Sequence, residues 1–100
     1  MNKQIKTVHF DADVNLINHV NKRLEKLSKF HDGITEVEVY LKLENVGHQI
    51  KDKIAEIRVA VPQHVFFVKE ESKSFEESFD GAFKALLSQI KRQKSKQLQK

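Results

Sequence analysis

One stretch near the end of the chain, SFEESFDGAFKALLSQIKRQKSKQLQK from Ser74 to Lys100, restricts the possible folds most strongly. Its apolar residues follow one another at spacings of one, three and four, which places them along one side of an α-helix. They are Phe75, Phe79, Ala82, Phe83, Leu86 and Ile90. Ser74 followed by Glu77 has the form of a capping box, so we expect the helix to begin there. A helix with one apolar side must pack that side against another apolar layer.

Charge changes sign along this predicted helix. Glu76, Glu77 and Asp80 occupy its first turns, and the cations that follow are Lys84, Lys91, Arg92, Lys94, Lys96 and Lys100. Residues 81–100 thus hold six Lys/Arg and no Asp/Glu, whereas the other eighty residues hold twelve against fourteen. Such an order also complements the helix dipole, so a solvated tail is one interpretation. The other interpretation is a surface that meets a polyanion.

A second helix is predicted from Val14 to Phe30, with Asp11 or Asp13 as its N-cap. Its apolar side consists of Leu16, Ile17, Val20, Leu24, Leu27 and Phe30. A basic stripe follows the same helix and consists of His19, Lys22, Arg23, Lys26 and Lys29. Only Glu25 offsets these cations, whereas an ordinary solvated helix face mixes both signs. We expect Gly33 to end the helix in the left-handed conformation.

Alternating apolar and polar residues predict four strands. They are QIKTVHF (4–10), ITEVEVYLKLENV (34–46), residues 53–61 and residues 65–68, with turns at Gly47 and at Pro62-Gln63-His64. The resulting β-α-β-β-β-α order makes the first two strands parallel neighbours, because such crossovers are right-handed. The later strands form an antiparallel meander. The predicted fold is therefore an α+β two-layer sandwich, with both helices on one face of a four-stranded mixed sheet and their basic stripes side by side.

Length and composition favour one compact domain, over residues 1–97 with a short basic tail to residue 100. No apolar run is long enough for a membrane helix, and MNKQIKTVHF lacks the apolar block of a signal peptide. The chain has no cysteine, which fits a reducing cytoplasm. We therefore expect a cytoplasmic protein.

Catalytic and metal-binding motifs are weak in this chain. His9, Asp11 and Asp13 form H-x-D-x-D, but a strand end and a helix cap account for the same residues, and no second cluster supplies further ligands. The sequence has no Ser/His/Asp spacing and no glycine-rich phosphate loop. We therefore expect no metal, no cofactor and no enzyme activity. Because Phe75, Phe79 and Phe83 belong to the core stripe and Tyr40 is the only aromatic residue clearly on an outer strand face, contact with structured RNA fits better than base stacking.

The ordered segments NKRLEKLSKFHDGI, VEVYLKLENV and DGAFKALLSQIKRQKSK resemble the ribosome hibernation promoting factor and ribosome-associated inhibitor family, in its short form. The likeness covers nearly the whole chain. It implies a fold like that of a double-stranded-RNA-binding domain. It also implies binding to the small ribosomal subunit, in the channel of mRNA and tRNA, and inhibition of translation by idle ribosomes in stationary phase or under stress.

The resemblance also implies which residues contact rRNA. On the first helix they are Lys22, Arg23 and Lys26, and on the second they are Lys91, Arg92, Lys94 and Lys96. The charge pattern adds Lys29 and Lys84. Gly33, Ala85 and Ser88 stand where family members often carry basic residues, so affinity or register can differ. The short form implies a monomer off the ribosome that pairs ribosomes, if at all, together with a second factor.

Two other functions remain open at this stage. A protein-interaction adaptor would dock its basic tail on an acidic partner without any RNA. A binder of free double-stranded RNA is suggested only by analogy of fold, which is a poor guide to function.

Overall fold

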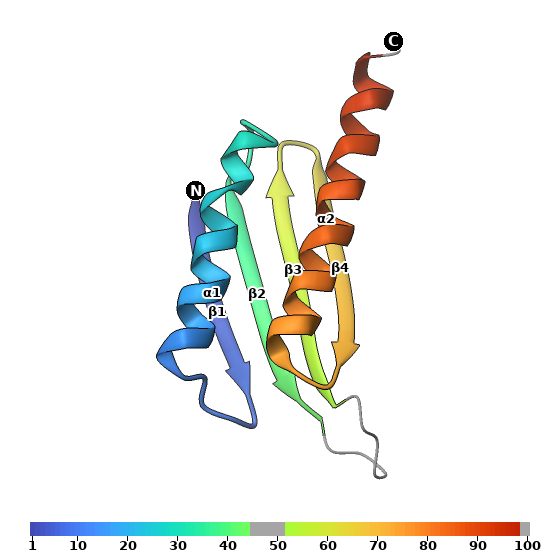
Figure 1. Ribbon diagram of the computed structural model, residues 1–100. Coiled ribbons are helices and arrows are strands. Elements are labelled where there is room, and N and C mark those ends of the chain that lie inside the picture. The colour runs from blue at the N-terminus through green and yellow to red at the C-terminus, as the bar shows by residue number, and fades with distance from the viewer. Residues whose placement is uncertain (45–51, 99–100) are drawn as a thin grey trace.

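The computed structural model describes residues 1–44 and 52–98. Its elements are β1 (Asn2–Val8), α1 (Val14–Glu25), a short 3-10 helix η1 (Leu27–Lys29), β2 (Glu36–Leu43), β3 (Lys53–Val61), β4 (His64–Ser72) and α2 (Phe75–Leu98). The strands form one sheet in the order β1-β2-β3-β4. β1 runs parallel to β2, and the other neighbours are antiparallel. Both helices cover the same face (Figure 1), so the predicted α+β two-layer fold is confirmed.

The core lies between the sheet and the two helices. Alternate residues of β2 and β3 point toward the helices and are buried, as the period of two requires. The apolar sides of the helices meet them through Leu16, Val20 and Leu24 of α1 and Phe79, Ala82, Phe83, Leu86 and Ile90 of α2. α2 packs on β3 and β4, and α1 lies over the side of β1 and β2 (Figure 1). The predicted core stripes are therefore confirmed.

The first helix of the structure is shorter than the helix that its apolar pattern predicts. Asp13 caps α1, since its Oδ1 accepts a hydrogen bond from the Leu16 amide at 2.8 Å. The α-helix ends at Glu25, and the chain tightens into η1 before Phe30. The prediction that Gly33 is left-handed is wrong, because its φ lies outside the left-handed range. The described non-glycine residues with positive φ are His9 and Gln63, each at 68°. The 3-10 turn already ends the helix, which removes the need for a left-handed glycine.

The two outer strands also differ from their predicted ranges. β1 ends at Val8, two residues earlier than expected, because His9 takes up the left-handed conformation. β4 extends from His64 to Ser72, well beyond the predicted apolar run, because its polar residues pair with β3 along the whole strand. The connection between β3 and β4 is the expected tight one, with Gln63 at positive φ. The turn predicted at Gly47 lies outside the described residues.

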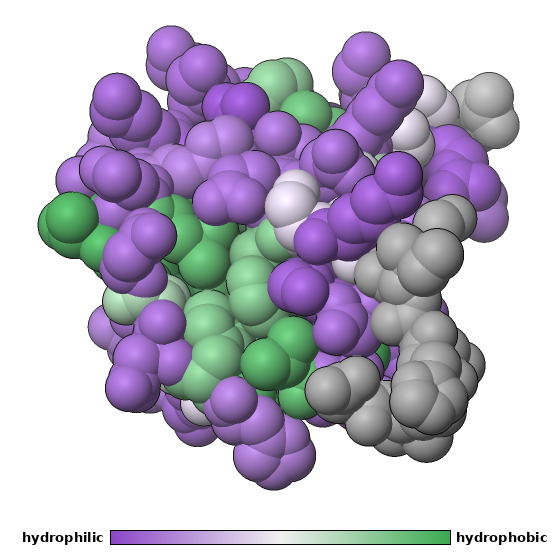
Figure 2. Space-filling model, turned by 60° about the horizontal axis from the view of Figure 1, so that its bottom comes forward, coloured by the Kyte–Doolittle hydropathy of each residue, from purple (hydrophilic) through white to green (hydrophobic). Residues whose placement is uncertain are grey.

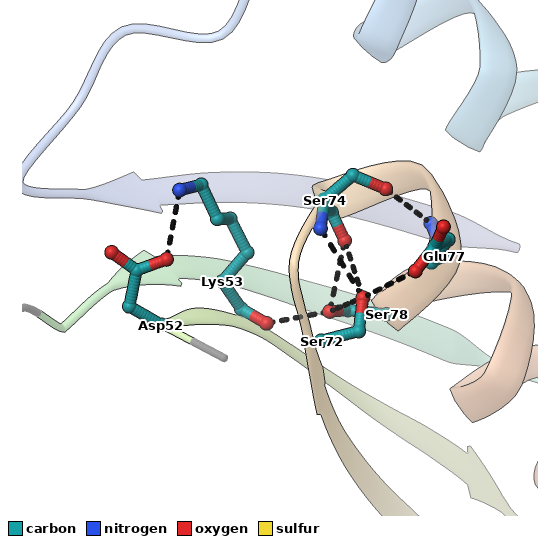
Figure 3. A network of polar contacts seen from close by, with 6 residues as sticks. All are labelled: Asp52, Lys53, Ser72, Ser74, Glu77 and Ser78. Atoms are coloured by element: carbon teal, nitrogen blue, oxygen red, sulfur yellow. Dashed lines mark hydrogen bonds and ion pairs between the residues drawn. The ribbon is translucent and has the colours of Figure 1, made fainter. Parts of the chain in front are cut away.

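A buried serine ties the start of α2 to the sheet (Figure 3). Ser78 is fully buried, and its hydroxyl lies 2.5 Å from the Lys53 carbonyl of β3 and 3.0 Å from the Ser74 carbonyl. The predicted capping box is half formed. The Glu77 amide donates to the Ser74 hydroxyl, but the Glu77 carboxylate accepts from Ser72 instead of from the Ser74 amide. These contacts fix where α2 leaves the sheet.

Aromatic packing closes the end of the domain where the chain enters both helices. Phe10, just before α1, stacks on Phe75, the first residue of α2, with ring centroids 4.2 Å apart. Figure 2 shows this end with hydrophobic residues gathered near its centre and hydrophilic residues around them. The stacked rings join the two helix starts, so the helices run in the same direction along the sheet (Figure 1).

The sheet face that points away from the helices has balanced charge. Tyr40 donates to Glu38 at 2.6 Å, Arg58 donates to the same carboxylate at 3.2 Å, and Lys42 pairs with Glu56. The hydrogen bond from Tyr40, with help from Arg58, lowers the pKa of Glu38, and the same bond raises the pKa of Tyr40. Paired charges of both signs make this face a poor match for a polyanion, so the candidate site lies on the helices.

Candidate nucleic-acid interface

The cations of the first helical segment form one exposed group near its C-terminal end. Lys22 and Lys26 are exposed on α1 and just after it, and Lys29 is exposed on η1. Together with Arg23 and Glu25 they line a shallow groove of about 420 Å³. Basic residues are also favourable at this place, because they complement the C-terminal end of the helix dipole. The structure therefore brings together the four cations that the sequence assigned to this segment.

Arg23 differs from its lysine neighbours, because it is held by an acidic residue of the other helix. Its Nε donates to Oδ1 of Asp80 on α2 at 2.7 Å, and Nε2 of His19 lies 2.7 Å from the same oxygen. The Asp80 side chain is 42% exposed and that of Arg23 is 36% exposed, so water screens this contact. The three side chains form a link between the two helices, and the charge of Arg23 is largely balanced there.

The link changes the pKa values of both charged partners. Partial burial alone would raise the pKa of Asp80, but the hydrogen bonds from Arg23 and His19 outweigh it, and the pKa is lowered. The hydrogen bond to Asp80 raises the pKa of Arg23. Both shifts favour the charged forms, so Asp80 stays a carboxylate and places negative charge between the two basic helices.

The cations of α2 are divided between two sides of the helix. With about 100° of turn per residue, Lys84, Lys91 and Lys94 lie within about 40° of the direction of Asp80, and so toward the α1 side. Arg92 and Lys96 are turned about 120° and about 160° away from it. The prediction that the two basic stripes lie side by side on one surface therefore holds for only part of the cations. Seven of them belong to α1 and η1 or lie on the α1 side of α2. The other two lie on the β4 side of α2. Lys100 lies outside the described residues.

A second groove lies on the β4 side of α2. Arg92 and Lys96 border it together with Gln89 and Gln93 of the same helix and His64 and Phe66 of β4, and its volume is about 370 Å³. Sequence reasoning missed its uncharged members. His64 was predicted to lie in a turn, and no role was assigned to the two glutamines. Only the pairing of β3 with β4 brings His64 beneath the last turns of α2.

Two of the H-x-D-x-D residues, His9 and Asp13, make contacts within the fold. Asp13 caps α1, and Nδ1 of His9 lies 3.4 Å from the Leu43 carbonyl. Across residues 1–44 and 52–98, no group of three or more His, Cys, Asp or Glu side chains is arranged to hold a metal ion. Neither helix in these ranges is both long and apolar enough to span a membrane.

Fold and charge together define a small α+β domain that carries positive charge on the helical layer and balanced charge on the opposite sheet face. A family model described as sigma 54 modulation protein / S30EA ribosomal protein matches residues 4–98. The chain belongs to this family, and the family resemblance seen in the sequence is confirmed. Comparison with curated protein sequences finds no significant match.

Two solved structures share the fold. A ribosomal subunit interface protein from Coxiella burnetii matches with a TM-score of 0.83 and 20% identity, over 95% of this chain and 99% of that chain. The N-terminal domain of Protein Y from Thermus thermophilus matches with a TM-score of 0.77 and 28% identity, over 92% of this chain and 98% of that chain. The first match supports the fold alone. The second match has the same fold and a sequence more similar to that of this chain.

Proposed function

We propose that this protein binds the small ribosomal subunit through the cations of its helical layer, lies in the channel of mRNA and tRNA, and inhibits translation by idle ribosomes. Residues 1–97 act as a single binding domain in the cytoplasm. The protein is a monomer off the ribosome, and any pairing of ribosomes involves a second factor. Membership of the S30EA ribosomal protein family supports a ribosomal target.

One structural observation carries the proposal. The cations of α1, η1 and the last turns of α2 lie toward the same end of the domain, because both helices run in the same direction along the sheet (Figure 1). Apart from Arg23, none of the nine assigned cations has an ion-pair partner within the described ranges. Exposed cations without acidic partners are free to contact phosphates, and each such contact releases counterions from the RNA.

Salt dependence of binding tests the proposal. The protein is sedimented with purified small subunits at rising salt, and the logarithm of the binding constant is plotted against that of the salt concentration. A protein with six to ten phosphate contacts loses roughly 10³–10⁵ in affinity between about 50 mM and 200 mM salt. The eight cations other than Arg23 place this protein in that range. Co-sedimentation unaffected by salt would contradict a phosphate-based interface.

The adaptor function predicts a different set of partners. Pull-down from cell extract, with and without nuclease, separates the two functions. Loss of ribosomal proteins from the captured set after nuclease treatment supports RNA-dependent binding. Partners that survive nuclease and include no ribosomal protein would favour the adaptor. A binder of free RNA duplexes would hold an isolated duplex as tightly as it holds the small subunit.

A further inference from the structure

The groove between α2 and β4 combines groups that the rest of the basic surface lacks. Its wall carries two cations, two amides and an imidazole, contributed by Arg92, Lys96, Gln89, Gln93 and His64. No carboxylate borders it. The groove on α1 and η1 is bordered by cations and Glu25 alone, without an aromatic ring or an amide. The groove between α2 and β4 therefore offers more than charge.

Arg92 and Lys96 are the two cations that border this groove. They are four residues apart on α2, which places them one turn apart on the same side of the helix. Like charges at this spacing repel each other, and neither has an ion-pair partner in the ranges that the structure describes. A phosphate between them relieves the repulsion, and the guanidinium of Arg92 suits its oxygen atoms.

His64 offers a flat surface beside the phosphate site. Its ring meets Phe66 edge-on, with centroids 4.5 Å apart, and Phe66 is only 1% exposed. The buried phenyl ring thus supports the imidazole from the core side, while His64 itself is exposed toward the groove. Aromatic side chains in this setting stack on unpaired bases.

Gln93 supplies an unsatisfied acceptor on the same wall. Its Oε1 is buried and has no hydrogen-bond partner among the described residues. Gln89 next to it donates to the Phe67 carbonyl of β4 at 3.4 Å, so the two glutamines have different roles. Rotation of the Gln93 side chain toward the groove would let Oε1 accept from an exocyclic amino group of a base.

We propose that this groove holds one unpaired nucleotide of the bound RNA, with its phosphate between Arg92 and Lys96 and its base against His64 and Gln93. The volume of about 370 Å³ lies at the lower end of the range of small-molecule sites, roughly 300–1,000 Å³. The inference rests on the proposed ribosome binding and adds one base contact to it. It departs from the prediction that the interface reads only shape and charge.

Two neutral substitutions test the base contact. His64→Ala and Gln93→Ala remove the stacking surface and the acceptor without changing a lysine or arginine. We expect each to weaken binding to purified small subunits about tenfold at every salt concentration, with the salt slope unchanged, because no phosphate contact is lost. Arg92→Gln lowers the slope by about 0.7–0.9. Asn15→Ala is the control, since Asn15 is an exposed polar residue near the start of α1, away from this groove.

Chemical footprinting on the same complexes separates base from backbone contacts. Wild-type protein should protect at least one unpaired base that becomes reactive with His64→Ala, while protection of the neighbouring backbone persists. Melting temperatures test whether each variant is folded. If the His64→Ala protein does not fold, the Gln93→Ala protein provides the test. Wild-type affinity and unchanged base protection in both variants would overturn the nucleotide site and leave the proposed function standing. Failure of the wild-type protein to bind small subunits would overturn both.

Discussion

Asp80→Asn is the most informative single change, because it removes the charge that links the two helices while keeping the size of the side chain. In the folded protein the carboxylate accepts from Arg23 and His19 through one oxygen, each at 2.7 Å. Asparagine retains a carbonyl oxygen but no charge, so the contact with the guanidinium becomes weaker. We expect α1 and α2 to pack less firmly against each other.

The size of the effect follows from exposure. Asp80 is 42% exposed and Arg23 is 36% exposed, so the solvent-screened value of about 0.2–1 kcal/mol per ion pair applies rather than that of a buried pair. We therefore expect the free energy of unfolding at pH 7 to fall by about 1 kcal/mol. In a domain of this length that lowers the melting temperature by about 4–8 °C.

The stability loss should depend on pH in one direction. The pKa of Asp80 is lowered in the folded state, so folding favours its charged form. The contribution is complete above the pKa of the unfolded chain and is lost as the pH falls through the lower pKa of the folded protein. Wild type and Asp80→Asn should therefore differ most above about pH 5 and converge in stronger acid.

Binding should change in the opposite sense to stability. Asp80→Asn removes negative charge from between the basic groups and frees Arg23, so affinity for the small subunit should not fall and the salt slope should steepen by up to about 0.9. Thermal melts, a double-mutant cycle with Arg23→Gln and the sedimentation assay measure these effects. Glu76→Gln is the control, an exposed acid in the first turn of the same helix. A zero coupling energy in the cycle would refute the link between the helices.

Two further predictions concern the basic surface and the start of α2. The Arg92→Glu and Lys26→Glu proteins should fold normally, since both residues are exposed, yet bind small subunits far more weakly. The two changes together should abolish inhibition of translation initiation. As a control, Glu76→Lys should leave binding largely unchanged. Ser78→Ala should lower stability by about 1–2 kcal/mol in thermal melts, because the Lys53 and Ser74 carbonyls lose a buried donor.

Specific results would contradict these expectations. Arg92→Glu and Lys26→Glu proteins that fold and still inhibit translation at wild-type concentrations would show that the basic surface is not the interface. Ser88→Ala, at an exposed serine of the same helix, is the control for the buried serine. Equal melting temperatures of the Ser78→Ala and Ser88→Ala proteins would show that the buried hydroxyl contributes nothing to stability.

The periodic apolar residues made the fold predictable. Period-two alternation in residues 34–44 and the helical stripe from Phe75 to Ile90 leave one arrangement that buries both, and the right-handed crossover fixes the order of the first strands. The ends of elements depend on weaker local effects. The glycine after the first helix suggested a left-handed cap, but the 3-10 turn at Leu27–Lys29 ends that helix earlier.

The candidate site was predictable in its charges but not in its neighbours. Lysine and arginine are recognisable in any sequence, and their lack of nearby acids is a local property. Asp80 looked like an acid that favours the start of a helix, and its contact with Arg23 spans 57 residues. His64 and Gln93 carry no pattern of their own. The role proposed for them depends only on the groove that β4 and α2 form together.

The last turns of α2 extend past the end of the sheet (Figure 1), and Ile90 is the last buried residue of the helix among the side chains described. A short lysine-rich peptide would not form a helix in water, because starting a helix costs more than extending it. Here the turns between Phe75 and Ile90 are already held by the core, so residues 91–98 need only to propagate an existing helix. Repulsion among its cations opposes that propagation, and a polyanion removes the repulsion. A bound polyanion should therefore stabilise these last helical turns, which the structure already forms, against fraying.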